Sequence, residues 1–303
     1  MKLVIRDLKK AEHFAYIFKC VPLISDHVNI VFALDKIYIQ TMDSNKVCLF
    51  ELMLHTNWFD EYNVNSNDNP CIGLNTAFFY SILKCRGKDQ SLEISYKGDA
   101  DKLSVVHNVS DNNYEKIFEL PLINLNSEML HIPAETEWEA DFEMKSSTFH
   151  KISQELLSFG EEVYLKCTED IFSMATEGDS GLYRVNVNID DLTCYSIDEE
   201  SIIKSVYNLR YFKIISAFSK LSNHMKFYAS QTMPLKVTYY LGDEPTLIKT
   251  MNGETDDVSV AEFMYDDEND LDEINENVDN DEGKNYIRFY LAAIIKEDIT
   301  NSV

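Results

Sequence analysis

The chain has 303 residues, 45% of them hydrophobic, which is enough for one large core or two ordinary ones. No apolar run reaches the roughly 18 residues that a membrane-spanning helix needs, and the opening residues MKLVIRDLKKAEHF lack the apolar centre of a signal peptide, so we expect an intracellular protein that spans no membrane. The formal net charge of −25 argues at first sight against a nucleic-acid-binding protein.

The start of the chain predicts one helix followed by three strands. The helix is amphipathic and contains FAYIFKCVPL. A strand (HVNIVFAL), a turn at Asp35-Lys36 and a second strand (IYIQTM) come next, with apolar and polar residues alternating. Asp43-Ser44-Asn45 has turn composition, and a new alternation runs from Val47 to Met53. This stretch therefore predicts a strand, a short connection and a further strand.

The middle of the chain predicts a second helix and then a linker. The helix contains GLNTAFFYSILKC. Leu122–Glu139 has no clean helical or strand period and carries Pro133. We interpret this segment as an ordered linker that crosses the surface, with an ordinary interdomain loop as the simpler alternative.

The second half of the chain repeats the first at a nearly constant offset. FHKISQELLSFG, EVYLKC, a turn at Glu169-Asp170 and IFSMAT follow each other as their counterparts do. Three pairs give the offset: Phe14 and Phe149 (135), Ile37 and Ile171 (134), and Leu74 and Leu209 (135). We predict an α+β fold with two similar domains of about 130 residues, each with two helices on one face of antiparallel sheets. The predicted limits are 1–121, a connector at 122–139, and 140–303.

An acidic insertion at about 244–284 interrupts the second domain. Within it, Gly253–Glu282 holds 14 of the 52 acidic residues and neither Lys nor Arg. Without this segment the charge balance is 27 − 38 = −11. Its low hydrophobicity and like-charge density predict a disordered insertion between the strands LKVTYY and YIRFYL.

The predicted helices are basic, in contrast to the acidic chain. In the helix predicted over Val206–Leu221, apolar residues follow one stripe and cations another. The cations of the four helices are Lys9, Lys10, Lys19, Lys84, Arg86, Lys151, Arg210, Lys213 and Lys220. The opposing acids are few, chiefly Glu12 and Glu155. One such helix would indicate only a solvated face, but four of them predict a basic inner surface of the kind that a ring around DNA requires.

Signatures of catalysis and of metal binding are weak. Gly178-Asp179-Ser180-Gly181 has the form of a serine-protease nucleophile motif, yet it falls in a predicted turn without a matching His and Asp pattern. The acidic insertion offers no calcium-loop frame, the seven histidines form neither HxxxH nor HExxH, and no glycine loop could hold a phosphate. The six cysteines show no CxxC spacing, which favours reduced thiols. We expect no enzyme, no metal and no cofactor.

Seven segments resemble the proliferating cell nuclear antigen family, the eukaryotic DNA sliding clamps. They are YIQTMDSNKVCL (Tyr38–Leu49), FDEYNV (Phe59–Val64), SILKCRG (Ser81–Gly87), LINLNSEMLHIP (Leu122–Pro133), LRYF (Leu209–Phe212), MPLKVTYY (Met233–Tyr240) and FYLAAIIKED (Phe289–Asp298). The resemblance implies two similar domains per protomer and a long connector. It also implies a homotrimeric ring, with helices around the hole and sheets outside that continue across subunit boundaries.

The resemblance also implies three groups of functional residues. A pocket for partner peptides would comprise Met42, Val47, Leu49, Leu130, Ile132, Pro234, Tyr290, Ala292 and Ala293. The nine helix cations would face DNA, and of these Lys84 and Arg210 match basic positions of the family. Subunits would meet through Ile117, Phe118, Leu120, Leu182, Tyr183 and Val185. Core packing is the alternative role of the pocket residues, most strongly for Val47 and Leu49.

The chain departs from the family pattern at several positions. Glu169 stands where relatives carry the lysine that ubiquitin modifies, so that regulatory route is in doubt. Ala293 replaces the usual proline at the pocket edge, and Asn208 replaces a small alanine near it. Partner preference is therefore expected to differ. Contacts with DNA are expected to be weak, because non-basic residues stand where the family often has a basic residue or histidine: Ser81, Gln154, Ser158 and Ala217.

These features together predict a DNA polymerase processivity factor that encircles duplex DNA as a homotrimer. Its expected partners are double-stranded DNA, DNA polymerase, the clamp loader and repair proteins that carry clamp-interacting peptides. The resemblance places it in the nucleus, with a viral replication site in the cytoplasm as the alternative. Two other functions stay open: a clamp-like factor that acts as a monomer or heterotrimer subunit, and a divergent hydrolase that uses Ser180.

Overall fold

The first half of the chain forms two helices and nine strands. The computed structural model describes residues 1–64, 70–98, 100–108, 115–126, 129–132, 138–179, 181–242, 281 and 283–295. Among these residues the first-half helices are α1 (Leu8–Cys20) and α2 (Thr76–Lys84). The strands are β1 (Lys2–Ile5), β2 (His27–Phe32), β3 (Lys36–Met42), β4 (Cys48–His55), β5 (Glu61–Asn63), β6 (Cys71–Asn75), β7 (Ser91–Ser95), β8 (Lys102–Asn108) and β9 (Lys116–Pro121).

The second half repeats this order. Its helices are α3 (Ser146–Leu156) and α4 (Leu209–Ser216). Its strands are β10 (Ala140–Lys145), β11 (Glu162–Cys167), β12 (Phe172–Gly178), β13 (Gly181–Val187), β14 (Cys194–Ile197), β15 (Ile203–Asn208), β16 (His224–Ala229), β17 (Leu235–Leu241) and β18 (Asn285–Leu291). The α+β fold with two similar halves is confirmed. None of the described helices is long and apolar enough to cross a membrane.

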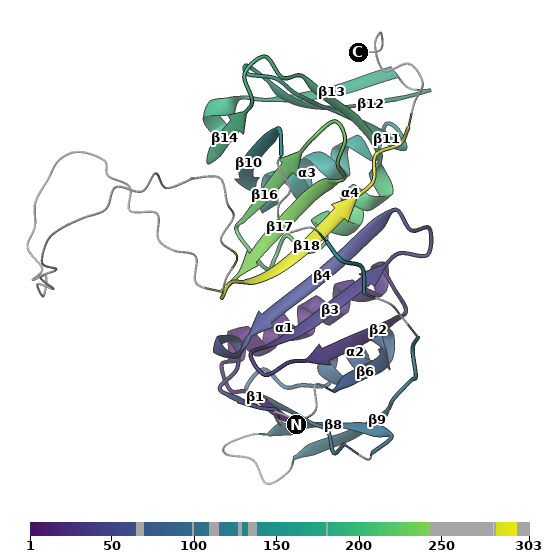
Figure 1. Cartoon of the computed structure of the whole chain (residues 1–303), viewed down its shortest axis with the longest axis vertical. Coiled ribbons are helices and arrows are strands. Elements are labelled where there is room, and N and C mark those ends of the chain that lie inside the picture. The colour runs from purple at the N-terminus through teal and green to yellow at the C-terminus, as the bar shows by residue number, and fades with distance from the viewer. Residues whose placement is uncertain are drawn as a thin grey trace, which may run out of the picture.

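The strands form three antiparallel sheets. A nine-stranded sheet has the order β14-β10-β16-β17-β18-β4-β3-β2-β6 and runs through both halves of the chain. A five-stranded sheet, β5-β1-β7-β8-β9, and a four-stranded sheet, β13-β12-β11-β15, lie at the two ends of the molecule. The helices lie behind the nine-stranded sheet in the view of Figure 1, with α1 packed on α2 and α3 packed on α4.

The two halves join where β18 pairs with β4. Tyr286 lies opposite Met53, and the register continues to Leu291 opposite Cys48. Beneath this pair of strands the rings of Phe50, Phe218 and Phe289 are 5.2–5.8 Å apart. Strand pairing and a shared aromatic cluster therefore make one continuous core of both halves.

The duplication explains how the three sheets are related. In chain order β1–β9 correspond to β10–β18, and α1 and α2 correspond to α3 and α4. Each half thus supplies a five-stranded part (β5-β1-β7-β8-β9 or β14-β10-β16-β17-β18) and a four-stranded part (β4-β3-β2-β6 or β13-β12-β11-β15). Within the chain, β18 of one five-stranded part joins β4 of the other half's four-stranded part. Their equivalents, β9 and β13, remain as edge strands.

Two helices begin later than the sequence pattern predicts. Gly73–Asn75 belongs to β6 and Val206–Asn208 to β15, not to the helices that follow. Asn75 accepts a hydrogen bond from the N–H of Phe78 at 2.9 Å, and Asn208 accepts one from the N–H of Arg210 at 2.9 Å. An asparagine in the extended conformation satisfies the first free N–H groups of a helix, so each helix starts directly after it.

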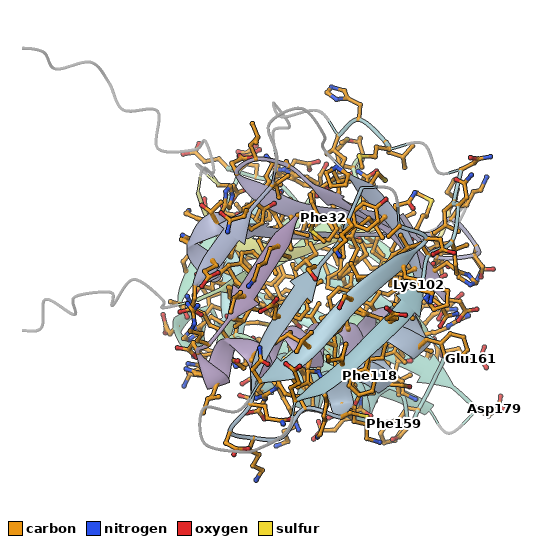
Figure 2. All side chains as sticks on the ribbon, turned by 90° about the horizontal axis from the view of Figure 1, so that it is seen from below. Phe32, Lys102, Phe118, Phe159, Glu161 and Asp179 are labelled. Atoms are coloured by element: carbon orange, nitrogen blue, oxygen red, sulfur yellow. The ribbon has the colours of Figure 1, made fainter. Side chains whose placement is uncertain are left out.

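Buried apolar side chains fill the space between helices and sheets. Figure 2 shows Phe32 within this mass of side chains, whereas Lys102, Glu161 and Asp179 lie at its periphery. Along α4 the predicted apolar stripe is confirmed, since Leu209, Phe212, Ile215 and Phe218 on and just after the helix are fully buried.

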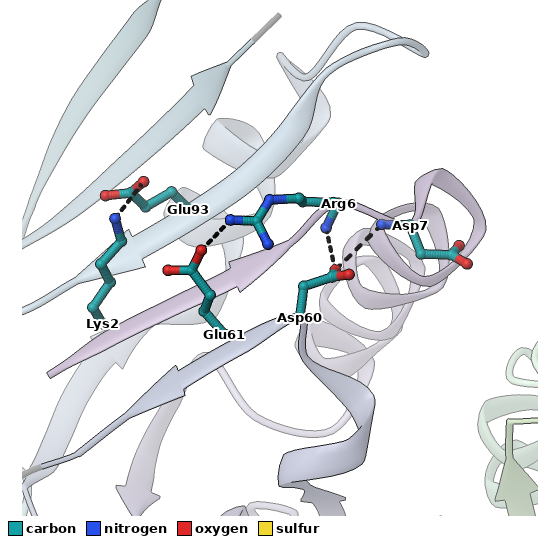
Figure 3. A network of polar contacts seen from close by, with 6 residues as sticks. All are labelled: Lys2, Arg6, Asp7, Asp60, Glu61 and Glu93. Carbon is teal, nitrogen blue, oxygen red and sulfur yellow. Dashed lines mark hydrogen bonds and ion pairs between the residues drawn. The ribbon is translucent and has the colours of Figure 1, made fainter. Parts of the chain in front are cut away.

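Polar contacts tie β1 to both neighbouring strands of the five-stranded sheet (Figure 3). Lys2 Nζ lies 3.1 Å from a carboxylate oxygen of Glu93 on β7, and the Arg6 guanidinium pairs with Glu61 on β5. The backbone N–H of Arg6 donates to Asp60 at 2.5 Å. Exposed ion pairs contribute about 0–1 kcal/mol each, so these contacts fix the strand register rather than provide most of the stability.

Candidate functional site

The turn between β3 and β4 is organised around the carboxylate of Asp43. Its Oδ1 accepts hydrogen bonds from the backbone N–H groups of Val47 and Cys48, both at 2.8 Å, and its Oδ2 accepts one from Asn45 N–H at 3.1 Å. Lys46 takes a left-handed conformation, φ 57°, to complete the turn. The turn is therefore stabilised by hydrogen bonds among its own residues. Met42 and Val47 lie at its two ends.

Strand pairing brings several predicted pocket residues together beside this turn. Leu49 on β4 lies opposite Met42 on β3 and opposite Tyr290 on β18. The N–H of Ala292 donates to the carbonyl of Val47 at 3.0 Å. These five residues come from three adjacent strands, from the turn between β3 and β4, and from the segment after β18. Met42, Val47 and Tyr290 are half-buried, whereas Leu49 is buried and belongs mainly to the core.

The chain after β9 is fastened to the nine-stranded sheet at three points. Ile123 N–H donates to Gly73 O at 2.8 Å, in contact so close that a Cβ on Gly73 would lie 2.1 Å from the carbonyl oxygen of Ile123. Asn29 Nδ2 donates to the carbonyl of Leu125 at 3.1 Å. The side chain of Gln40 both accepts from Leu130 N–H (2.6 Å) and donates to Leu130 O (3.0 Å).

A partly buried chain of polar side chains holds Gln40 in place. Gln40 Nε2 donates to the hydroxyl of Tyr38 at 3.1 Å, and that hydroxyl donates to Glu51. Glu51 is only 4% exposed, and burial raises the pKa of Tyr38, so the hydroxyl stays protonated as a donor. The contact between Gln40 and Leu130 thus rests on a fixed chain of three side chains.

A surface pocket of about 410 Å³ lies between the sheet and this segment. It is lined by His27, Val28, Asn29, Gln40, Thr41, Met42, Leu49, Asn124, Leu125, Asn126 and Leu130. Of the predicted pocket residues it contains Met42, Leu49 and Leu130. The other six predicted pocket residues do not line it, although all are described: Val47, Ile132, Pro234 and Tyr290 are half-buried, and Ala292 and Ala293 are exposed. Its polar wall of Asn29, Gln40, Thr41, Asn124 and Asn126 was not predicted from the sequence, because these residues come together only through strand register and the course of the chain after β9.

Two of the predicted cations gather where α1 meets the end of α4: Lys19 is on α1, but Lys220 lies in the turn after α4 and not on the helix as predicted. The Nζ atoms of Lys19 and Lys220 lie 5.3 and 5.9 Å from the ring centroid of Tyr16. The Tyr16 hydroxyl donates to Ala217 O at 3.0 Å and so links the two halves. The two cations, 201 positions apart in sequence, thus share one place on the helix layer.

The other predicted DNA-facing cations differ in whether their side chains are exposed, and so able to bind a phosphate, or already donate hydrogen bonds to the protein backbone. The exposed ones on helices are Lys9, Lys84, Lys151, Arg210 and Lys213. By contrast, the half-buried Arg86 donates to the carbonyl oxygens of Gly87 (3.0 Å) and Gln90 (2.8 Å) and so closes its own loop. Lys10 Nζ donates to Asn57 O at 3.1 Å. These two cations have structural contacts that compete with binding of an external phosphate.

The predicted subunit-interface residues lie on the two edge strands β9 and β13. Ile117 on β9 is 58% exposed and Leu182 on β13 is 51% exposed, whereas Leu120 is buried. Phe118, Tyr183 and Val185 are half-buried. The Tyr183 ring stacks on the partly exposed Phe159 with centroids 4.8 Å apart, and its hydroxyl donates to Glu155 at 2.8 Å. Each edge therefore combines open backbone groups with exposed apolar side chains.

The described residues give no support for metal binding, and they do not include the serine on which the hydrolase alternative depends. Within these parts of the chain, no group of three or more His, Cys, Asp or Glu side chains could hold a metal ion. Ser180, the nucleophile of the hydrolase alternative, lies outside the described residues, and so does most of the acidic insertion.

Comparison with protein families matches both halves of the chain. Residues 5–129 match the N-terminal domain of proliferating cell nuclear antigen, and residues 131–250 match its C-terminal domain. The two matches lie side by side and cover most of the sequence, in agreement with the duplicated fold. The family is one of non-enzymatic DNA clamps. The chain belongs to the proliferating cell nuclear antigen family of sliding clamps.

Proposed function

We propose that the chain is a processivity factor that closes into a homotrimeric ring around duplex DNA. It recruits replication and repair proteins through the surface pocket that Met42, Leu49 and Leu130 line. It catalyses no reaction of its own. The ring keeps the polymerase on the template by encirclement, so the mechanism is topological.

The equivalence of the sheet edges carries this proposal. Inside the chain, β18 pairs with β4; their equivalents β9 and β13 are edge strands at opposite ends of the molecule. Pairing β9 of one copy with β13 of the next would repeat the internal junction, 5 + 4 strands again making nine. Such head-to-tail contacts use two different surfaces of each copy and close into a ring when the rotation per copy permits.

The helix layer supports DNA as the molecule inside the ring. All four helices lie on one side of the nine-stranded sheet (Figure 1), and six of the predicted cations on them are exposed: Lys9, Lys19, Lys84, Lys151, Arg210 and Lys213. Facing inward, these cations would attract phosphates although the whole chain has a charge of −25. Having only a small number of strong contacts between these cations and DNA phosphates would suit a ring that must slide along the duplex.

The pocket supports recruitment of peptides with an aliphatic residue and two aromatic residues on one helical turn. Met42, Leu49 and Leu130 provide apolar walls, and the pocket volume of about 410 Å³ suits side chains of that size. DNA polymerase and the clamp loader are the proposed carriers of such peptides.

Substitution at either edge strand should break the ring in a directional way. Ile117→Glu on β9 and Leu182→Glu on β13 each place a charge in the proposed interface, so each variant alone should sediment as a monomer. A mixture of the two retains one intact β9–β13 pair per encounter and should form dimers but no ring.

Leu34→Glu is the matched control, because Leu34 is 55% exposed but lies in the turn between β2 and β3. It should assemble as the unmodified chain does. Sedimentation velocity distinguishes these cases. Unchanged assembly of both edge variants would contradict the proposed interface.

Removing the Met42 side chain should weaken peptide binding. We expect Met42→Ala to raise the Kd of a fluorescent peptide with Leu followed three residues later by Phe-Phe about tenfold, because apolar contact is lost in the pocket. Met53→Ala is the control, since Met53 is also half-buried on β4 but lies outside the pocket lining. Equal Kd values for both variants would place the peptide elsewhere.

Removing two exposed cations of α4 should weaken DNA binding and its salt dependence. For Arg210→Ala with Lys213→Ala, the plot of log K against log salt for a short duplex should become shallower by up to about 1.8, from about 0.9 for each phosphate contact. Lys2→Ala with Lys102→Ala removes the same charge from the five-stranded sheet and should leave the slope unchanged. A greater effect of the control pair, measured by fluorescence anisotropy, would argue against helices around the hole.

A further inference from the structure

A hydrogen bond between two buried side chains connects the pocket turn to the other half of the chain. The hydroxyl of Tyr211 on α4 donates to Asp43 Oδ2 at 2.7 Å, across 168 positions of sequence. Both side chains are buried, with 4% of Tyr211 and 6% of Asp43 exposed. The side-chain amide of Asn45 lies 3.5 Å from the same hydroxyl. The pocket turn therefore contacts the second half through its central carboxylate.

The local structure fixes both partners of this bond. Asn208 caps α4, which places Tyr211 in the first turn of the helix, and the rest of its buried face anchors α4 in the core. Burial raises the pKa of Tyr211, so its hydroxyl remains a donor. Burial also acts to raise the pKa of Asp43, but the N–H groups of Cys48 and Val47 and the Tyr211 hydroxyl bring it below its usual value. The pair is a neutral donor with an ionised acceptor.

The Asp43 carboxylate connects the Tyr211 hydroxyl to the backbone of the pocket turn. Its second oxygen holds the N–H groups of Val47 and Cys48, and the Val47 carbonyl in turn accepts from Ala292 N–H. Met42 directly precedes Asp43 on β3. Rotation of the carboxylate would therefore move both ends of the turn at once.

We propose that Tyr211 is a positioning residue for partner recognition: its hydroxyl holds Asp43, and through it the Met42–Val47 turn, in the conformation that accepts a partner peptide. This inference rests on the proposed function of the pocket. Tyr211 itself is not part of the pocket lining, so its effect on a bound peptide is indirect.

The first test compares peptide binding by the unmodified chain, Tyr211→Phe and Tyr195→Phe. Phenylalanine keeps the ring and removes only the hydroxyl. Tyr195 is a matched control, because its hydroxyl donates to the carbonyl of Thr168 at 2.7 Å, away from the pocket. We expect the Kd of the Leu–Phe-Phe peptide to rise about threefold to tenfold for Tyr211→Phe, since hydrogen bonds to charged groups are the stronger ones, and to stay unchanged for Tyr195→Phe.

A double-mutant cycle with Asp43→Asn separates positioning from general stability. If Tyr211 acts through Asp43, adding Tyr211→Phe to Asp43→Asn should change the Kd little further. Purely additive effects, or a Kd for Tyr211→Phe equal to that of the unmodified chain, would overturn the proposal.

Methyl NMR spectra of the peptide-free protein test the same claim independently. Tyr211→Phe should shift the Met42 and Val47 methyl signals, and Tyr195→Phe should not. Unchanged signals would overturn the positioning role. Failure of the unmodified chain to bind the peptide would instead refute the pocket assignment, while the methyl shifts would still decide whether Tyr211 controls the turn.

Discussion

The pairing of β18 with β4 is the contact on which the other features depend. It joins two copies of one fold edge to edge, so that their sheets become a single nine-stranded sheet with the helices on one side. Backbone hydrogen bonds set its register, and the Phe50–Phe218–Phe289 cluster buries the apolar surface beneath it. Because each half has the same two edges, pairing one set inside the chain leaves the equivalent strands β9 and β13 at sheet edges, where we propose that they pair with a neighbouring copy.

The same junction places the candidate pocket. Tyr290 and Ala292 reach Leu49 and Val47 only because β18 lies beside β4. Asp43 then connects this region to α4 of the second half. Partner binding and the relative position of the two halves should therefore be coupled, since a shift of α4 would disturb the carboxylate that shapes the turn. Gln40 provides a second support, from the sheet to the chain after β9.

Much of the fold followed from the sequence, whereas much of the site's geometry did not. The constant offset between the halves and the apolar stripe of α4 predicted the duplicated α+β fold, because both patterns are visible in the linear order of the residues. The first residues of α2 and α4 were assigned wrongly, since their capping asparagines compete with an apolar period that continues from the preceding strand. The contacts of Gln40 with Leu130 and of Asp43 with Tyr211 join residues 90 and 168 positions apart. They depend on three-dimensional register, which composition does not encode.

The native mass of the chain at low micromolar concentration tests the central claim most directly. One copy has a mass of 35.1 kDa. Edge pairing of β9 with β13 in a closed trimer predicts a single species at three times this mass in native mass spectrometry. A single species at 35.1 kDa would contradict the account, because both apolar edges would then remain open in solution.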